Sequence, residues 1–221
     1  MADFDAEQDN LFKEIDEDLR QERFAKLWKR YGNYIIGIAV IIVVAVGGIQ
    51  FWRSWDLKQR TAEGAKFTAA LRAADKNQLQ QAVDGMAALA KSGETGYGLL
   101  ARFDEAALLA KNGNAKAAVE TYLKIASDTK VDEIYRDLAR LLATLHEADS
   151  GDPAMLIARL APLTEGSNPW RHSARELTAL LNKRAGNTEQ ALKLYRDLAD
   201  DPSAPAGVRA RAAEMAAIVG G

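Results

Sequence analysis

The chain contains no cysteine, which excludes disulfide bonds, thiolate metal sites and cysteine nucleophiles. This absence leaves the compartment open, because an oxidising space permits disulfides without requiring them. Proline does not occur before Pro153, so no residue forces a helix to break in the preceding part of the chain. β-Branched residues are scarce beyond residue 52, where alanine and leucine dominate. We therefore expect helices there and no strand.

Groups that carry chemistry are also few. Only two histidines occur, and His146 has no second metal ligand at a plausible spacing. His172 and Glu176 are four residues apart, but two ligands fall short of a usual metal site, and we expect a solvated ion pair at a helix start. Ser173 is no nucleophile for His172, because adjacent helical residues point apart. Residues 96–98 (Gly-Tyr-Gly) lack the strand and third glycine of a dinucleotide site and are expected to separate two helices. The sequence predicts no catalytic, metal-binding or cofactor-binding residue, no cofactor and no enzyme.

No strong excess of either charge is present, since the formal net charge is −2. Residues 53–221 hold 22 acids against 23 bases, whereas residues 1–30 hold nine acids against six bases. A nucleic-acid-binding surface requires a concentrated basic patch, so we expect no nucleic-acid partner.

One long apolar run stands out. Residues 31–52 (YGNYIIGIAVIIVVAVGGIQFW) contain no charged side chain, and a helix of this length rises about 33 Å, enough for a hydrocarbon core of about 30 Å. Aromatic and basic residues flank both ends, as at membrane interfaces. We predict a single transmembrane helix. A buried core helix would be shorter, and a cleaved signal peptide would begin with a short basic segment rather than 30 mostly acidic residues.

The segment before this run has the pattern of an amphipathic helix. Leu11, Ile15 and Leu19 recur on one face of residues 3–27, among many acids. Two interpretations remain open: an arm that docks on a partner at the membrane, or a solvated tail. Five basic residues lie shortly before the apolar run and four shortly after it. Charge alone therefore does not determine the orientation of the helix in the membrane.

Helical patterns continue from the apolar run to the end of the chain. Asp152-Pro153 and Asn168-Pro169 each pair a capping side chain with proline at the first helical position. Short loops between helices make consecutive helices antiparallel. The predicted helices cover residues 56–74, 78–91, 97–112, 115–127, 131–148, 153–163, 169–185, 188–200 and 204–219.

An internal repeat emerges at a shift of 73 residues. The shift superimposes Ala106, Leu108, Gly113, Asn114, Ala118, Tyr122 and Ala126 on Ala179, Leu181, Gly186, Asn187, Ala191, Tyr195 and Ala199. This offset is about two helical hairpins, and it indicates a degenerate tetratricopeptide pattern without the usual Trp-Leu-Gly start. The alternative is an Ala/Leu-rich bundle that matches itself by composition. We expect the last helix to cap the stack.

These features together resemble a known family. An acidic arm, the basic-aromatic lead at residues 24–32, a span ending at residues 51–55 (FWRSW) and degenerate helical hairpins are similar to the YfgM-type ancillary subunit of the bacterial Sec translocon. The resemblance implies a single-pass bacterial inner-membrane protein with a cytoplasmic N-terminus and a periplasmic repeat domain. It also implies the Sec channel, periplasmic chaperones and newly exported polypeptides as partners.

The predicted architecture is therefore all-α: an N-terminal transmembrane helix followed by a tetratricopeptide-like, right-handed solenoid of helical hairpins. The predicted segments are a cytoplasmic arm (1–30), the span (31–52) and the repeat domain (53–221). The leading functional hypothesis is a membrane-tethered protein–protein interaction module, ancillary to the Sec translocon, that binds chaperones or exported chains in a groove. The alternative is a structural scaffold for envelope or cell-division assemblies.

Overall fold

The computed structural model describes the backbone of residues 2–93 and 95–221, and the side chains of residues 25–93 and 95–221. Two compact units divide the chain, Met1–Lys58 and Gln59–Gly221. In the described residues all regular structure is helical, and the predicted all-α class with a hairpin solenoid is confirmed. The elements are α1 (Ala2–Asp75), α2 (Leu79–Ser92), α3 (Gly96–Lys111), α4 (Ala115–Ser127), α5 (Glu133–Glu147), α6 (Pro153–Leu160), the 3-10 turn η1 (Ala161–Leu163), α7 (Arg171–Arg184), α8 (Thr188–Asp200) and α9 (Ala206–Gly220).

The first unit consists of the N-terminal part of α1. The helix runs without interruption through the predicted arm and the apolar run, as the lack of proline allows. The apolar face predicted for Leu11, Ile15 and Leu19 lies outside the residues whose side chains are described. Large apolar side chains between residues 35 and 49 are exposed, and this part of α1 is long and apolar enough to cross a membrane.

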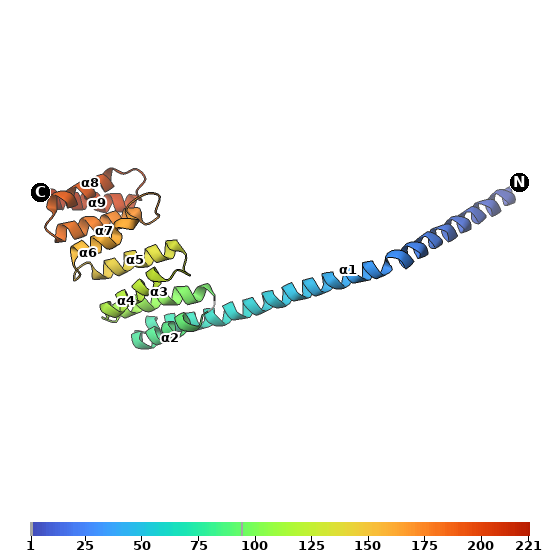
Figure 1. The fold of residues 1–221 in the computed structure, drawn as a ribbon, viewed down its shortest axis with the longest axis horizontal. Helices are drawn as coiled ribbons and strands as arrows, with labels where there is room; N and C mark the ends of the chain where they lie inside the picture. Colours follow the sequence, from blue (N-terminus) through green and yellow to red (C-terminus); the bar gives the residue numbers. More distant parts are fainter. Residues whose placement is uncertain (1, 94) are drawn as a thin grey trace. The chain divides into compact units, whose positions relative to one another are not determined.

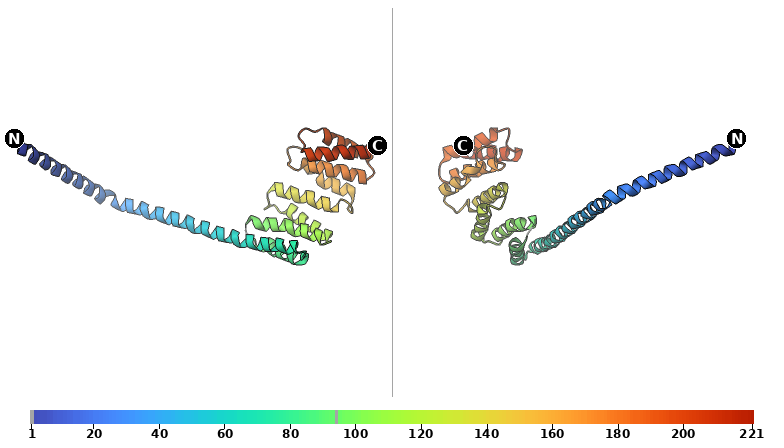
Figure 2. Two further views of the ribbon diagram at one scale, coloured as in Figure 1. Left: turned by 180° about the vertical axis from the view of Figure 1, so that it is seen from behind. Right: turned by 45° about the vertical axis from the view of Figure 1, so that its right-hand side comes forward.

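The second unit is a stack of antiparallel helical hairpins. Residues 59–75 of α1 pair with α2, α3 with α4, α5 with α6, and α7 with α8, while α9 packs on the last hairpin. In Figure 1 the hairpins follow one another in chain order from α2 to α8, with α9 drawn between α7 and α8, and the colours in both views of Figure 2 show the same succession. Each helix therefore contacts mainly its neighbours in the sequence, as in other solenoids.

Four apolar clusters fill the stack in succession. Met86 and Leu89 centre the first, Tyr122 and Ile125 the second. The third joins α5, α6, η1 and α7, and the fourth joins α7, α8 and α9 around Tyr195. Fully buried alanines stand at the helix crossings, because small residues let helices approach closely. They are Ala82, Ala101, Ala106, Ala118, Ala139, Ala143, Ala174, Ala179, Ala191 and Ala212.

The 73-residue repeat appears in the backbone as well as in the sequence. Gly113 and Gly186 end α3 and α7, and both have φ +83°, the left-handed conformation that glycine adopts without steric cost. Asn114 and Asn187 then precede α4 and α8, and their backbone N–H groups donate to Leu109 and Asn182, each at 2.9 Å. The two turns share one geometry, which matching by composition alone would not produce.

A pair of ion contacts obeys the same offset, and the sequence pattern did not reveal it. Arg102 Nη1 of α3 lies 2.8 Å from Asp128 Oδ2, just after α4. Exactly one repeat later, Arg175 Nη1 of α7 lies 3.9 Å from Asp201 Oδ2, just after α8. Each contact joins the first helix of a hairpin to the end of its second helix. The hydrogen bond from Arg102 is the largest influence that lowers the pKa of Asp128.

Of the two helix starts predicted from a capping residue followed by proline, one is confirmed and the other is shifted. Asp152 caps α6 as predicted, accepting from the N–H of Ala154 at 2.9 Å, with Pro153 at the first helical position. At Asn168-Pro169 the side chain of Asn168 accepts from the N–H of Trp170 at 2.9 Å, as a capping residue does, but the predicted helix start is wrong by two residues, because α7 begins at Arg171. Asn168 also donates from Nδ2 to Asp137 Oδ2 at 2.8 Å and holds the preceding loop against α5.

Residues 96–98 do not separate two helices but form the first turn of α3. Thr95 caps that turn, with its hydroxyl accepting from the N–H of Tyr97 at 3.2 Å. Gly98 lies against the backbone of Gly93, where an added Cβ would stand only 2.6 Å from the Gly93 carbonyl oxygen. Glycine at this position therefore permits a close backbone approach rather than a break.

Candidate functional site: an apolar pocket on successive first helices

The first helices of the last hairpins form a hollow in the second unit. Helix α7 contacts both α5 and α9, so one face of the stack is made of these three helices. A pocket of about 540 Å³ lies on this face. It is lined mainly by apolar side chains, with a few polar groups: Leu141, Leu142, Leu145, Ser173, Glu176, Leu177, Leu180, Tyr195, Arg211, Glu214 and Met215.

The floor of the pocket is continuous with the core, and its edge is open to solvent. Leu177 is buried, and Tyr195 reaches the pocket from α8 behind the three helices. By contrast, Leu145 is 52% exposed and Leu180 38% exposed. Exposed leucines that continue an apolar floor mark a surface that another molecule can cover.

Polar groups stand along one edge, on α7 and α9. Arg211 donates from Nε and Nη2 to the two carboxylate oxygens of Glu176, at 2.7 and 2.8 Å. This bidentate pair raises the pKa of Arg211 and joins α9 to α7 across the edge of the pocket. Glu214 lies one helical turn beyond Arg211 and is exposed. Burial raises the pKa of Tyr195, and the Glu176 carboxylate adds to that effect.

The preceding repeat carries a related but more polar surface. Tyr122, the counterpart of Tyr195, is buried and stacks on His146 with ring centroids 5.6 Å apart. Asp104 occupies the place of Leu177. The pKa of Tyr122 is raised mainly by the burial of its own hydroxyl and secondly by the negative charge of the half-buried Asp104 carboxylate. Burial also raises the pKa of Asp104 itself. The preceding repeat therefore has a carboxylate where the pocket has the buried side chain of Leu177.

His172 and Glu176 do not form the solvated pair that their spacing suggests. His172 is only 5% exposed, and Glu176 binds Arg211 instead. The imidazole Nδ1 lies 3.5 Å from Asp201 Oδ2, and neither ring nitrogen makes a hydrogen bond to another described group. The prediction failed because α8 and the turn after it cover this face of α7, a contact that local spacing does not reveal.

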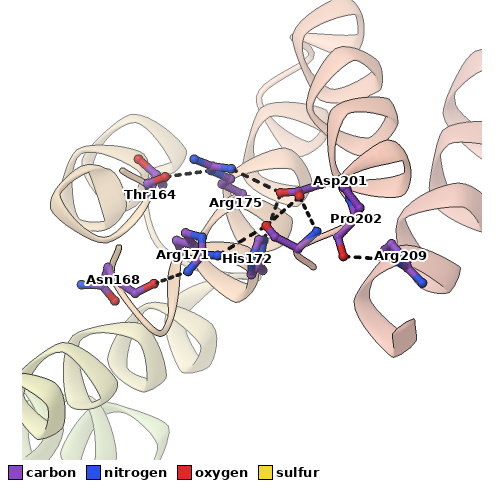
Figure 3. A network of polar contacts seen from close by, with 9 residues as sticks. Thr164, Asn168, Arg171, His172, Arg175, Asp201, Pro202 and Arg209 are labelled. Atoms are coloured by element: carbon purple, nitrogen blue, oxygen red, sulfur yellow. Dashed lines mark hydrogen bonds and ion pairs between the residues drawn. The ribbon is translucent and has the colours of Figure 1, made fainter. Parts of the chain in front are cut away.

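A polar network surrounds this buried histidine, at the start of α7 (Figure 3). Arg175 donates from Nε to the carbonyl of Thr164 at 2.7 Å, and Asp201 accepts from the backbone N–H and hydroxyl of Ser203 at 2.8 and 2.7 Å. Those two bonds are the main reason that the pKa of Asp201 is lowered. Burial is the main cause that lowers the pKa of His172, followed by the charge of Arg171.

The described residues contain no group of three or more histidine, aspartate or glutamate side chains that could hold a metal ion. His146 packs against Tyr122, and His172 faces Asp201 with its nitrogens buried. These histidines therefore do not contribute to the pocket, whose lining is mainly apolar with charged side chains at its edge.

The comparison with known families agrees with this repeat architecture. The model of the tetratricopeptide repeat-like domain matches residues 25–201, most of the chain. The chain belongs to the tetratricopeptide repeat-like domain family. Such helical-repeat domains are protein–protein interaction modules and are generally not enzymes. No curated protein matches the chain.

The sequence predicted the repeat but not the pocket. Its repeat residues are mostly buried alanines and tyrosines, together with the exposed glycines of the turns. The pocket lining includes residues that differ between the repeats, such as Leu177 and Leu180, whose counterparts are Asp104 and Ala107. Comparison of the two repeats for such apolar replacements is the signal that could have found it.

Proposed function

We propose that this protein is a membrane-tethered interaction module, ancillary to the bacterial Sec translocon, that binds periplasmic chaperones or newly exported chains. The observation that carries the proposal is the open apolar pocket on α5, α7 and α9 of a tetratricopeptide-like stack. Stacked helical repeats use such faces to bind segments of other proteins.

The tether is the second element of the proposal. The exposed apolar part of α1 crosses the inner membrane, with the N-terminal arm in the cytoplasm and the hairpin stack in the periplasm. Attachment keeps the pocket near polypeptides as they leave the channel, and the resulting local concentration makes weak contacts sufficient. The segments 1–30, 31–52 and 53–221 then act as arm, span and repeat domain.

Replacement of the span tests the translocon association. Residues 31–52 are exchanged for an unrelated transmembrane helix of the same length, so that the tether is kept while its surface changes. If the channel contact lies along the span, the native chain co-purifies with the channel and the exchanged chain does not. Equal co-purification would move the contact into the hairpins, and no co-purification of either chain would contradict the proposed association.

The alternative function is a structural scaffold for envelope or cell-division assemblies. This candidate is favoured by exposed apolar side chains outside the pocket, such as Met155 and Ile134, which offer further contact surfaces along the hairpins. A scaffold holds fixed partners at constant amounts, whereas a module for exported chains loses its ligands when protein synthesis stops. Partner recovery before and after arrest of protein synthesis distinguishes the two.

A further inference from the structure

The shape of the α5–α7–α9 pocket fits side chains of a polypeptide better than an enclosed small molecule. Small-molecule sites bury most of their ligand, whereas Leu145 and Leu180 leave this pocket open along its edge. The apolar lining, with Leu177 and Met215, is contributed by several helices, so that a bound segment would lie across them. The surface therefore has the form of a docking groove for part of another chain.

The charged side chains at the edge of the pocket have a net negative charge. Arg211 and Glu176 compensate each other through their bidentate contact. Glu214 lines the pocket on the same side of α9, and its carboxylate has no cationic partner among the described residues. The edge of the pocket therefore carries one uncompensated negative charge.

The acidic character continues on the preceding repeat. Asp104, the counterpart of Leu177, lies beside Tyr122 and has no ion pair with any described cation. Apolar floor and acidic flanks together select for an apolar segment with positive charge, because complementary charge determines partner choice more than total affinity.

We infer that the pocket binds an apolar segment of another polypeptide that carries a lysine or arginine next to its leucine-like side chains. The apolar side chains cover Leu177, Leu180 and Met215, and the cation lies against Glu214. This inference rests on the proposed function for the location of the site, and adds the chemistry of its ligand.

Binding of defined peptides to the full chain in lipid nanodiscs tests the inference. Two dye-labelled peptides share the same leucines, and one carries lysines where the other carries glutamates. Fluorescence anisotropy is measured against protein-free discs, which set the background of membrane partition. We expect the lysine peptide to bind about threefold to tenfold more tightly, since an exposed charge contact has a modest effect.

Variants locate the effect on the pocket. Glu214→Lys should reverse the preference between the two peptides, and Leu180→Asp should weaken both by about tenfold or more, as for a central apolar contact. Asp197→Lys, an exposed acid on α8 outside the pocket lining, should leave both affinities unchanged. Thermal unfolding followed by circular dichroism verifies that each variant folds.

Three results would overturn the inference: equal binding of the two peptides, a preference that survives Glu214→Lys, or self-association of the full chain that Leu180→Asp abolishes. The last would assign the pocket to a second copy of the chain. The assay contains no translocon and no cells, so its outcome is independent of whether the span contacts the channel.

Discussion

His172 shows at the residue scale how the hairpin stack places a titratable group where it is not solvated. The imidazole is covered by α8 and faces the Asp201 carboxylate at 3.5 Å, while Arg171 and Arg175 lie nearby. Burial and the two cations disfavour its charged form more than Asp201 favours it, so the pKa of His172 lies below its ordinary value of 6.5.

The first prediction concerns the pH dependence of stability. Above pH 6.5 the imidazole is neutral in both the folded and the unfolded chain. As the pH falls below that value, the unfolded chain binds a proton that the folded chain does not, so the free energy of unfolding decreases until the folded pKa is passed. One such group lowers it by at most about 1.4 kcal/mol per pH unit.

Urea unfolding of the full chain at pH 7 and pH 5, compared with His172→Phe, measures this contribution. The variant keeps a ring in the buried space and removes the titration, and all other groups act as a shared background. We expect the native chain to lose more stability than the variant between the two pH values. Parallel losses would show that His172 does not bind its proton differently in the two states.

The solvated ion pair predicted for His172 from its spacing to Glu176 was wrong for a physical reason. His172 and Glu176 are correctly predicted to share a helix, but which face of that helix is covered depends on α8 and α9. Arg211, 35 residues beyond Glu176, captures the carboxylate that local spacing assigned to His172. Contacts of this range follow from packing and leave no local pattern.

At the scale of elements, the hairpin turns are the part most strongly determined by single residues. Gly113 and Gly186 both adopt φ +83°, and no side chain stands where their Cβ would be. The cost of a substitution there is therefore conformational rather than a clash with neighbours.

Alanine substitution at these turns should destabilise the stack. We expect Gly113→Ala and Gly186→Ala each to lower the free energy of unfolding by about 1–2 kcal/mol, because alanine disfavours the left-handed conformation. Gly207→Ala is the matched control: this exposed glycine in α9 lacks a positive φ, and alanine should raise stability by up to about 1 kcal/mol. Denaturant unfolding measures all three. Equal effects at the three positions would contradict the turn geometry.

Most helix bounds could be predicted because capping signals and glycine turns lie in the sequence itself, as at Asp152-Pro153. The start of α7 could not, because Trp170 donates from Nε1 to the Ile134 carbonyl at 2.9 Å and Asn168 binds Asp137 on α5. These bonds hold the residues before α7 in a turn on another hairpin. The pocket could not be predicted from the sequence either, because it is formed by the packing of α5 and α9 against α7.

At the scale of the whole molecule, the chain combines an apolar helix long enough to cross a membrane with a stack of helical hairpins. A phosphatase that is active only outside the cytoplasm, fused after Gly221, tests the orientation. We expect an active fusion, because the proposal places the hairpins in the periplasm, and an inactive one with residues 31–52 deleted. An inactive fusion to the full chain, with the fusion protein present in the membrane fraction, would reverse the assignment.

Crosslinking from the pocket in living bacteria tests the central claim most directly. A photoreactive residue replaces Leu180, and in a matched chain it replaces Met155, which is 68% exposed on α6 outside the pocket lining. The account predicts that Leu180 captures newly synthesised exported polypeptides, that these adducts vanish when synthesis is arrested, and that Met155 captures none of them. Adducts at Leu180 that persist unchanged after arrest, or equal capture from both positions, would contradict it.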